Sequence, residues 1–294
     1  MSKTKFGFVG IVGRPNVGKS TLLNYIIGEK IAIVSEKPQT TRTQILGIKS
    51  TENSQFVFID TPGIHRPRHA LGEFLDEQAI SAISSADVIL YMVDSAYTSA
   101  QDYVIRHFKQ TETPVLLIIN KIDLLKSKIK IDEIILSYID QFDFHGVYPI
   151  SSLMGTHINH LLKDIETLLP VGKAMFALEE TTTQTDFTRM SELIREKILH
   201  YTKEEIPHSV AVIIEHTEIF EGIYYVYATI VVERASQKNI LIGKGGSMLK
   251  KIGTKARTDI NETLNTQIHL NLWVKVIKDW RRRRTHLKGL GYDN

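Results

Sequence analysis

The 294-residue sequence predicts a doubly wound α/β domain followed by a smaller α+β domain. Three observations lead to this prediction: apolar runs alternate with helical patterns up to residue 168, a glycine-rich loop joins the first run to the first helical pattern, and the element order changes after a polar, Thr-rich stretch. The predicted divisions are an α/β domain at 1–172, a linker at 173–189, an α+β domain at 190–280 and a basic C-terminal tail at 281–294.

Continuous apolar runs predict the strands of the first domain, because a parallel sheet that is covered on both faces buries its strands along their whole length. Helical patterns lie between the runs, at 21–27, 71–83 and 131–139, where apolar residues recur at helical spacing. The predicted strands are Phe6–Val12, Gln44–Ser50, Gln55–Asp60, Val88–Val93, Val115–Ile119 and Val147–Ile150.

The segment after the first apolar run has the phosphate-loop pattern of Gly, four residues and then Gly-Lys-Ser. Between a strand and a helix, the N–H groups of such a loop and the helix N-terminus face phosphates, Lys19 neutralises their charge, and the Ser20 hydroxyl ligates magnesium. A stray glycine-rich turn is the alternative, which the flanking strand and helix patterns disfavour. The loop residues are Gly13, Arg14, Pro15, Asn16, Val17, Gly18, Lys19 and Ser20.

A second motif indicates the base. Asn120 and Asp123 follow a buried-strand run, and therefore lie at the carboxyl end of a strand, where α/β sheets bind ligands. An Asp in this place accepts hydrogen bonds from guanine N1–H and the exocyclic amine, and a site built on such bonds rejects adenine. The Lys121 stem is expected along the base plane, and the backbone after the last strand near guanine O6. The predicted base-binding residues are Asn120, Lys121, Ile122, Asp123, Ser151 and Ser152.

The motif Asp60-Thr61-Pro62-Gly63 completes the nucleotide site. Asp60 is expected to serve magnesium and the Gly63 N–H to contact the γ-phosphate, while the sequence does not choose between Thr40 and Thr41 as the residue that closes over the nucleotide. Ras-type proteins carry a water-orienting Gln after this motif, but this chain has Ile64, so intrinsic hydrolysis is expected to be slow. The candidate switch loops are Val34–Thr43 and Ile64–Ala70.

The composition is that of an ordinary globular protein, with 43% hydrophobic and 23% charged residues. There is no cysteine, so disulfides and zinc–thiolate sites are excluded. No apolar run approaches the ~20 residues that span a bilayer, and Met1–Lys5 lacks an apolar signal core. We therefore predict a cytoplasmic protein, with peripheral association on the cytoplasmic face of the membrane as an open alternative.

The charge is unevenly distributed along the chain. Residues 1–172 have a net charge of −1 and residues 173–294 a net charge of +4, while 234–291 alone contain 14 basic and 3 acidic residues. Such a concentration is typical of a polyanion binder, and a solvated basic surface is the alternative. The run Arg281–Arg284 has three interpretations: a solvated helix end, an RNA-phosphate patch or an anionic-membrane patch.

The second domain has the predicted order helix, strand, strand, short helix, helix, strand, with Gly-Lys-Gly-Gly between its last two helices. This arrangement is the signature of a KH nucleic-acid module, whose loop clamps a single-stranded backbone. A plain connection between helices is the alternative, which the element order and the basic surroundings disfavour. The predicted helices are 190–202 and 247–264, and the strands 209–218, 222–233 and 268–278. The predicted RNA-binding residues are Ile242, Gly243, Lys244, Gly245, Gly246, Lys250 and Lys251.

The chain resembles the Era-type bacterial GTPases, a Ras-like GTPase domain followed by a KH domain, across essentially its full length. The motifs that carry the resemblance lie at 13–21, 39–42, 60–64, 120–123, 243–246, 269–275 and 290–292. The resemblance implies a type II KH domain and the hydrolysis of GTP to GDP and phosphate, and we expect the protein to be a monomer. It also implies binding near the 3′ end of small-subunit ribosomal RNA and a role in the biogenesis of the small ribosomal subunit.

For this hydrolysis the expected magnesium ligands are Ser20, Thr40, Thr41 and Asp60, and the candidate catalytic residues are Asn16, Lys19, Thr40, Thr41 and Gly63. In similar GTPases the residue that matches Asn16 ligates potassium, and a simple turn residue is the alternative. Two competing functions remain: a membrane-proximal regulatory GTPase whose basic tail binds anionic lipid, and an RNA chaperone with a vestigial nucleotide site.

Overall fold

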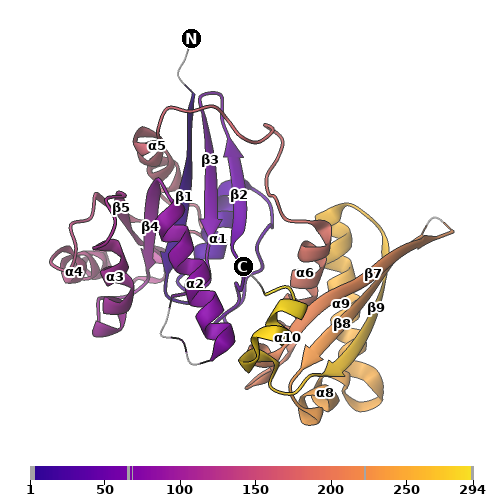
Figure 1. Ribbon diagram of the computed structural model, residues 1–294. Coiled ribbons are helices and arrows are strands. Elements are labelled where there is room, and N and C mark those ends of the chain that lie inside the picture. Colours follow the sequence, from indigo (N-terminus) through magenta and orange to yellow (C-terminus); the bar gives the residue numbers. More distant parts are fainter. Residues whose placement is uncertain (1–3, 65–66, 68, 222, 293–294) are drawn as a thin grey trace. The chain divides into compact units, whose positions relative to one another are not determined.

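The computed structural model describes residues 4–64, 67, 69–221 and 223–292. The chain forms two compact units (Figure 1). The first comprises Met1–Ala32, Thr41–Pro67 and Leu75–Thr183, and the second comprises Ile33–Thr40, Arg68–Phe74 and Gln184–Asn294. The junction between Thr183 and Gln184 falls within the predicted linker, and the limits of that linker remain a prediction.

The first unit is built on a six-stranded sheet in the order β2-β3-β1-β4-β5-β6. Its neighbours pair in parallel except for β2, which runs antiparallel to β3. Parallel pairing requires crossover connections, and helices supply them. The strands are β1 (Lys5–Gly13), β2 (Ile45–Ser50), β3 (Ser54–Asp60), β4 (Val88–Val93), β5 (Val115–Ile119) and β6 (Gly146–Pro149).

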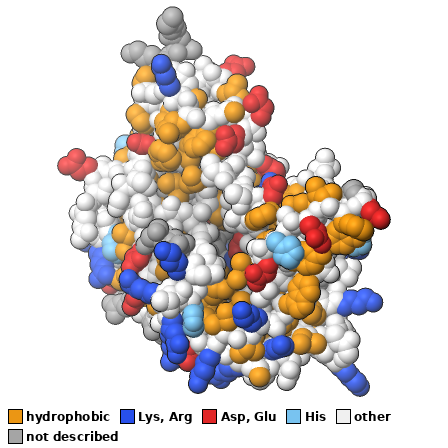
Figure 2. Space-filling view, turned by 45° about the vertical axis from the view of Figure 1, so that its right-hand side comes forward, with side chains coloured by type: hydrophobic (Ala, Val, Ile, Leu, Met, Phe, Trp, Pro, Cys, Tyr) orange, Lys and Arg blue, Asp and Glu red, His pale blue; other side chains and the backbone are white. Residues whose placement is uncertain are grey.

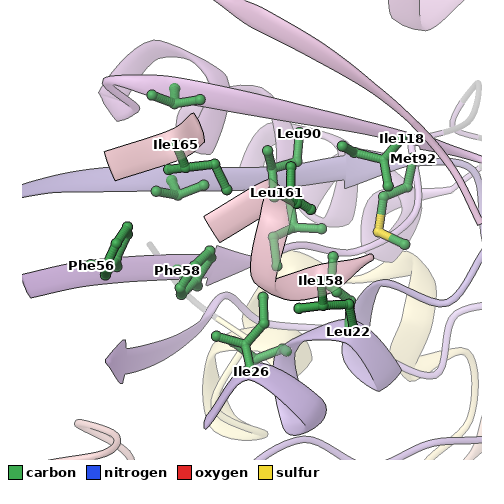
Figure 3. Packing of buried hydrophobic residues seen from close by; sticks show 14 of the residues in the cluster. Leu22, Ile26, Phe56, Phe58, Leu90, Met92, Ile118, Ile158, Leu161 and Ile165 are labelled. Atoms are coloured by element: carbon green, nitrogen blue, oxygen red, sulfur yellow. The ribbon is translucent and has the colours of Figure 1, made fainter. Parts of the chain in front are cut away.

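Helices cover both faces of this sheet, which confirms the predicted doubly wound class. Alternate strand residues face opposite sides. Leu90 and Met92 of β4 pack in the cluster under α1 and α5 (Figure 3), whereas Ile89 and Tyr91 pack in a second cluster with α2, α3 and α4. The helices are α1 (Lys19–Ile27), α2 (Ala70–Ser85), α3 (Asp102–Phe108), α4 (Lys128–Ile139) and α5 (Ile158–Leu168).

The second unit has the predicted α-β-β-α-α-β order around a three-stranded sheet, β7-β8-β9, with one short helix added before the first strand and another after the last. Strand β8 pairs antiparallel with β7 and parallel with β9. One apolar cluster joins α6, α8 and α9 to the sheet, and includes Leu193, Leu241 and Ile252 beside Val226 and Ile230 of β8. The elements are α6 (Asp186–Tyr201), α7 (Ile206–Ser209), β7 (Ala211–Phe220), β8 (Ile223–Val232), α8 (Ala235–Ile242), α9 (Ser247–Leu264), β9 (Ile268–Val276) and α10 (Arg284–Gly289).

The C-terminal tail is anchored at its start and exposed along its basic run. The fully buried Trp280 donates from Nε1 to the Ser209 carbonyl at 3.0 Å, and Arg281 pairs with Glu233 at 2.6 Å. Residues 282–284 of the run are exposed, and Figure 2 shows Lys and Arg side chains gathered along the lower edge of the visible face. The three interpretations of the basic run therefore concern its last three arginines. Among the described helices, none combines the length and apolarity that a membrane span requires.

Candidate nucleotide and RNA sites

The phosphate loop joins the end of β1 to the start of α1, and its backbone requires glycine at two positions. Gly13 has φ 153° and Gly18 has φ 103°, a region that favours glycine. A side chain on Gly13 would meet the Met92 carbonyl, and one on Gly18 would meet the side chain of Asn120. Glycine is therefore required at both positions, because residues at the ends of neighbouring strands occupy the space that a side chain would need.

Lys19 is the buried cation of this loop. Its side chain is 6% exposed, and its Nζ donates to the carbonyls of Gly13 at 3.2 Å and Arg14 at 3.0 Å. Burial lowers the pKa of Lys19 to about 8, against the opposing effect of the Asp60 charge. An anion beside this ammonium would favour its charged form and raise that pKa.

Three side-chain oxygens converge beside Lys19. Ser20 Oγ donates to Asp60 Oδ2 at 2.5 Å, and the Thr41 hydroxyl lies 2.9 Å from Ser20 Oγ and 3.4 Å from the same carboxylate oxygen. Asp60 is fully buried, and burial raises its pKa. Thr40 instead donates its hydroxyl to the Lys37 carbonyl at 2.6 Å. Of the four predicted magnesium ligands, the structure thus brings together Ser20, Thr41 and Asp60 but not Thr40.

This oxygen cluster, defined as Ser20, Thr41 and Asp60, fits a magnesium ion. Magnesium prefers hard oxygen ligands such as carboxylates. The second carboxylate oxygen of Asp60, Oδ1, is buried and has no hydrogen-bond partner among the residues that the structure describes. A buried polar atom normally has a partner, and a cation would supply one here.

The predicted base-binding motif is hydrogen-bonded to the phosphate loop through Asn120. Asn120 donates to the Val17 carbonyl at 2.8 Å, and its Oδ1 accepts from both the backbone N–H and the hydroxyl of Ser152 at 2.9 Å. Asp123 is exposed, and its carboxylate accepts from the Ser151 hydroxyl at 2.5 Å. Asn120 therefore links the phosphate loop to the loop after β6, while the exposed Asp123 carboxylate is held by the buried Ser151 hydroxyl.

Lys121 is held by a residue that the sequence analysis did not predict. Its Nζ donates to the Asn16 carbonyl at 2.6 Å and pairs with Asp94 at 2.7 Å. Asp94 directly follows the buried strand β4, and a carboxylate immediately after a strand is the sequence feature that could have marked it as a site residue. Because Lys121 has φ 62°, its backbone turns sharply just after β5, and Ile122 donates to the Ile150 carbonyl at 3.2 Å.

Two residues that follow Asp60, Thr61 and Gly63, contact β1 and the phosphate loop. Thr61 donates its hydroxyl to the Ile11 carbonyl at 2.8 Å, and a side chain on Gly63 would lie 2.5 Å from the Pro15 nitrogen. Ile64 is buried in the apolar cluster of α2, α3 and α4, so it cannot orient a water. Of the predicted switch loop at 64–70, residues 65, 66 and 68 lie outside the described part of the chain.

The Gly-x-x-Gly loop of the second unit lies between α8 and α9. Gly243, Gly245 and Gly246 all have positive φ, at 72°, 59° and 80°. Nothing lies within 4 Å of a side chain built on Gly245 or Gly246, so the backbone conformation rather than space requires glycine at these two positions. Lys244 and Gly245 are exposed. The loop thus presents backbone and one cation to solvent.

The other predicted RNA-binding residues differ in their surroundings. Lys250 is exposed on α9. Lys251 lies with its Nζ 4.2 Å from the ring centroid of Tyr201, so a cation–π contact with α6 occupies it. Ile242 packs against the apolar cluster of the second unit. Both lysines are therefore exposed on α9, and Lys251 in addition contacts α6 through Tyr201.

Comparisons with known proteins match both units. Residues 8–121 match the family described as 50S ribosome-binding GTPase, and residues 205–281 match the family described as KH domain. The structure of Aquifex aeolicus Era bound to GDP and aluminium fluoride is 36% identical, covers 99% of this chain and 100% of that one, and has a TM-score of 0.95. A structure of Era with MgGDPNP and nucleotides 1506–1542 of 16S ribosomal RNA is 37% identical, with coverage of 99% and 100% and a TM-score of 0.96.

The geometry of the base site predicts that Asp123→Asn changes nucleotide preference. An amide can donate where the carboxylate only accepts, so the variant should bind GTP at least 100-fold more weakly and should bind xanthosine triphosphate more tightly. Competition binding with a fluorescent nucleotide measures both affinities. Asp132→Asn, an exposed change on α4, is the control and should behave as the wild type. An Asp123→Asn variant with normal GTP affinity would remove Asp123 from the base site.

The lowered pKa of Lys19, about 8, predicts proton uptake when a nucleotide binds. Above pH 8 the nucleotide-free protein loses the Lys19 proton, and bound phosphates would restore this charge, so affinity should fall as the pH rises above 8. Calorimetry of GDP binding in buffers of different ionisation enthalpy counts the protons. Lys19→Arg, whose guanidinium does not titrate in this range, should abolish the uptake; equal uptake in both proteins would assign the proton to another group.

Proposed function

The chain belongs to the Era family of GTPases, and from this membership we propose that it hydrolyses GTP to GDP and phosphate while binding small-subunit ribosomal RNA near its 3′ end. We propose further that it acts with GTP bound as a factor in the biogenesis of the small ribosomal subunit. The observation that supports this best is the meeting of phosphate loop, oxygen cluster and base motif at one edge of the first sheet.

In the proposed mechanism the phosphate loop and Lys19 receive the β- and γ-phosphates. The loop supplies backbone N–H groups at the start of α1, and its helix N-terminus favours negative charge. Ser20, Thr41 and Asp60 would hold magnesium, which neutralises charge on the phosphate oxygens when bound. Gly63 lies against Pro15 of the loop, and its N–H is our candidate for contact with the γ-phosphate.

Hydrolysis by this site is expected to be slow without an activator. A water-orienting side chain is missing at position 64, because Ile64 is buried in an apolar cluster. Asn16 lies exposed in the phosphate loop with φ 67°. We propose that its side-chain oxygen helps to hold a potassium ion, which would add positive charge beside the transferring phosphoryl group without a protein arginine.

The second unit is proposed to bind RNA through the Gly-x-x-Gly loop. Its glycines leave the backbone open to a phosphate, and the loop leads directly into the N-terminus of α9, whose dipole favours an anion. Lys244 and Lys250 add exposed positive charge on either side of this turn. Such a surface clamps a single-stranded backbone, as in other KH modules.

Co-sedimentation tests this function against the membrane alternative. The protein is mixed with small ribosomal subunits or with vesicles of anionic lipid, each in the presence of a non-hydrolysable GTP analogue or GDP. We expect binding to subunits that depends on the nucleotide, together with measurable GTP turnover. Nucleotide-dependent binding to vesicles alone would support a membrane-proximal GTPase, and absence of turnover would support a chaperone with a vestigial site.

The proposed role of Asn16 predicts a potassium-dependent rate. GTP turnover should be at least 10-fold faster in potassium chloride than in sodium chloride at equal ionic strength, because the ion would stabilise charge that develops on the phosphates. Asn16→Ala should turn over at the same low rate in both salts while keeping its GDP affinity. Equal wild-type rates in the two salts, or a normal rate for the variant, would contradict the proposal.

The proposed RNA site predicts that the double variant Lys244→Asp, Gly245→Asp loses RNA binding and keeps GTP binding. Two carboxylates would then face the RNA phosphates, so affinity for a 16S 3′-end oligonucleotide should fall at least 100-fold, and its dependence on salt should flatten. Filter binding at several salt concentrations measures both effects. The pair Lys203→Asp, Thr258→Asp makes the same charge change at exposed positions of the second unit and is the control. An equal loss in both proteins would indicate that only net charge matters.

A further inference from the structure

The sheet of the second unit has one face that points away from the helices, and we name it the outer face. Val226 and Ala228 of β8 pack in the apolar cluster with α6, α8 and α9. Because alternate strand residues face opposite sides, Tyr225 and Tyr227 lie on the outer face. The strand registers add residues of β7 and β9 to it. The outer face thus includes His216 and Glu218 of β7, Tyr225 and Tyr227 of β8, and His269, Trp273 and Lys275 of β9.

Three rings on the outer face form a stack that crosses all three strands. The ring centroids of His216 and Tyr227 are 4.2 Å apart with planes at 11°, and those of Tyr227 and Trp273 are 5.9 Å apart with planes at 18°. Tyr227 therefore has a ring on each side. The stack ends at Trp273, because β9 is an edge strand of the sheet. Trp273 is 54% exposed, so a further flat ring can be added at this end.

The two edges of the sheet differ in charge. At the β7 edge, Glu215 and Glu218 are exposed. Strand β9 contains no acidic residue, and its exposed Lys275 lies on the outer face two residues after Trp273. A polyanion is therefore attracted to the end of the stack at Trp273 and repelled from the opposite end.

Positive charge continues beyond the end of β9. Arg234 and Lys278 line a cavity of about 380 Å³ at this end of the strand, together with Glu233 and Asp279. Glu233 is already paired with an arginine of the tail. Residues 275–284 contain six basic residues and one acidic residue. The edge of β9 therefore continues into a positively charged surface along which a nucleic-acid backbone can run.

The surroundings of Trp273 favour a nucleic acid over other partners. The second tryptophan of the chain, Trp280, is fully buried and hydrogen-bonded through Nε1, as is usual for this residue type. An exposed aromatic ring beside cations is the combination that binds single-stranded nucleic acid, because the ring stacks on a base and the cations contact the backbone. A flat anionic membrane would also meet the acidic residues of the β7 edge, and an apolar protein patch would leave the cations without a partner.

We propose that the outer face binds a single-stranded segment of RNA at its β9 edge, with one base stacked on Trp273 and the backbone following Lys275 and Lys278. This surface is separate from the Gly-x-x-Gly loop, because α8 and α9 pack on the opposite face of the sheet. The proposal rests on the proposed function only for the identity of the polymer as RNA. Two surfaces on one compact unit would hold two segments of the same strand, which strengthens binding to a long RNA more than to a short one.

Fluorescence anisotropy with a labelled oligoadenylate tests the proposal on the full chain. The background is the double variant Lys244→Asp, Gly245→Asp, in which the loop no longer competes for the RNA. We expect this protein to retain weak binding, and Trp273→Ala in the same background to lower the remaining affinity roughly 5- to 150-fold, the effect of losing one stack between a base and an aromatic ring. Trp273→Phe should keep most of the affinity, because its ring can still stack.

The variant Lys275→Gln tests the backbone contact. It should weaken binding at low salt and reduce the salt dependence by the share of about one phosphate contact, whereas Lys203→Gln, at another exposed position of this unit, should be neutral. Phe220→Ala is the matched control for Trp273→Ala, since Phe220 is 60% exposed at the end of β7, and it should leave the affinity unchanged. Unfolding midpoints in urea show whether the variants are folded equally well.

Three results would overturn the proposal: no oligoadenylate binding in the double variant, normal affinity after Trp273→Ala in that background, or an equal loss after Phe220→Ala. Binding to anionic vesicles that depends on Trp273, with unchanged RNA affinity, would overturn it in favour of a membrane contact.

Binding of the 16S 3′-end oligonucleotide separates this inference from the proposed function. If the wild-type chain binds that oligonucleotide and the outer-face variants bind oligoadenylate normally, only the inference fails. If the wild-type chain binds oligoadenylate through Trp273 but does not bind the 16S oligonucleotide, the proposed function fails and the outer-face site stands.

Discussion

The parallel pairing of β1 with β3 and β4 is the constraint on which the nucleotide site depends. Its register places Ile11 opposite Asp60 and Gly13 opposite Met92. Because parallel strands end at the same edge, the phosphate loop, the Asp60 carboxylate and the loop after β4 emerge side by side. Gly13 and Gly18 of the loop must be glycine for the same reason, since residues at the neighbouring strand ends occupy the space that side chains would need.

The sequence predicts those parts of the fold and site that are determined by consecutive residues. Apolar runs located the six strands of the first sheet to within two residues at each end, because a sheet covered on both faces leaves little room for polar residues. The phosphate loop and the base motif are equally local, since their chemistry needs fixed residue types at fixed spacing. The comparisons confirm the family and the two-domain fold that these motifs predicted.

Other features depend on contacts between residues far apart in the chain, and sequence patterns did not reveal them. Thr40 and Thr41 are chemically identical, and only the backbone direction places the second hydroxyl beside Ser20. Asp94 gains its role from Lys121, 27 residues later. Arg195 looks like a surface charge of an amphipathic helix until its partner, the carbonyl of Thr40, 155 residues earlier, is seen. In each case the tertiary structure, not the local pattern, decides the role.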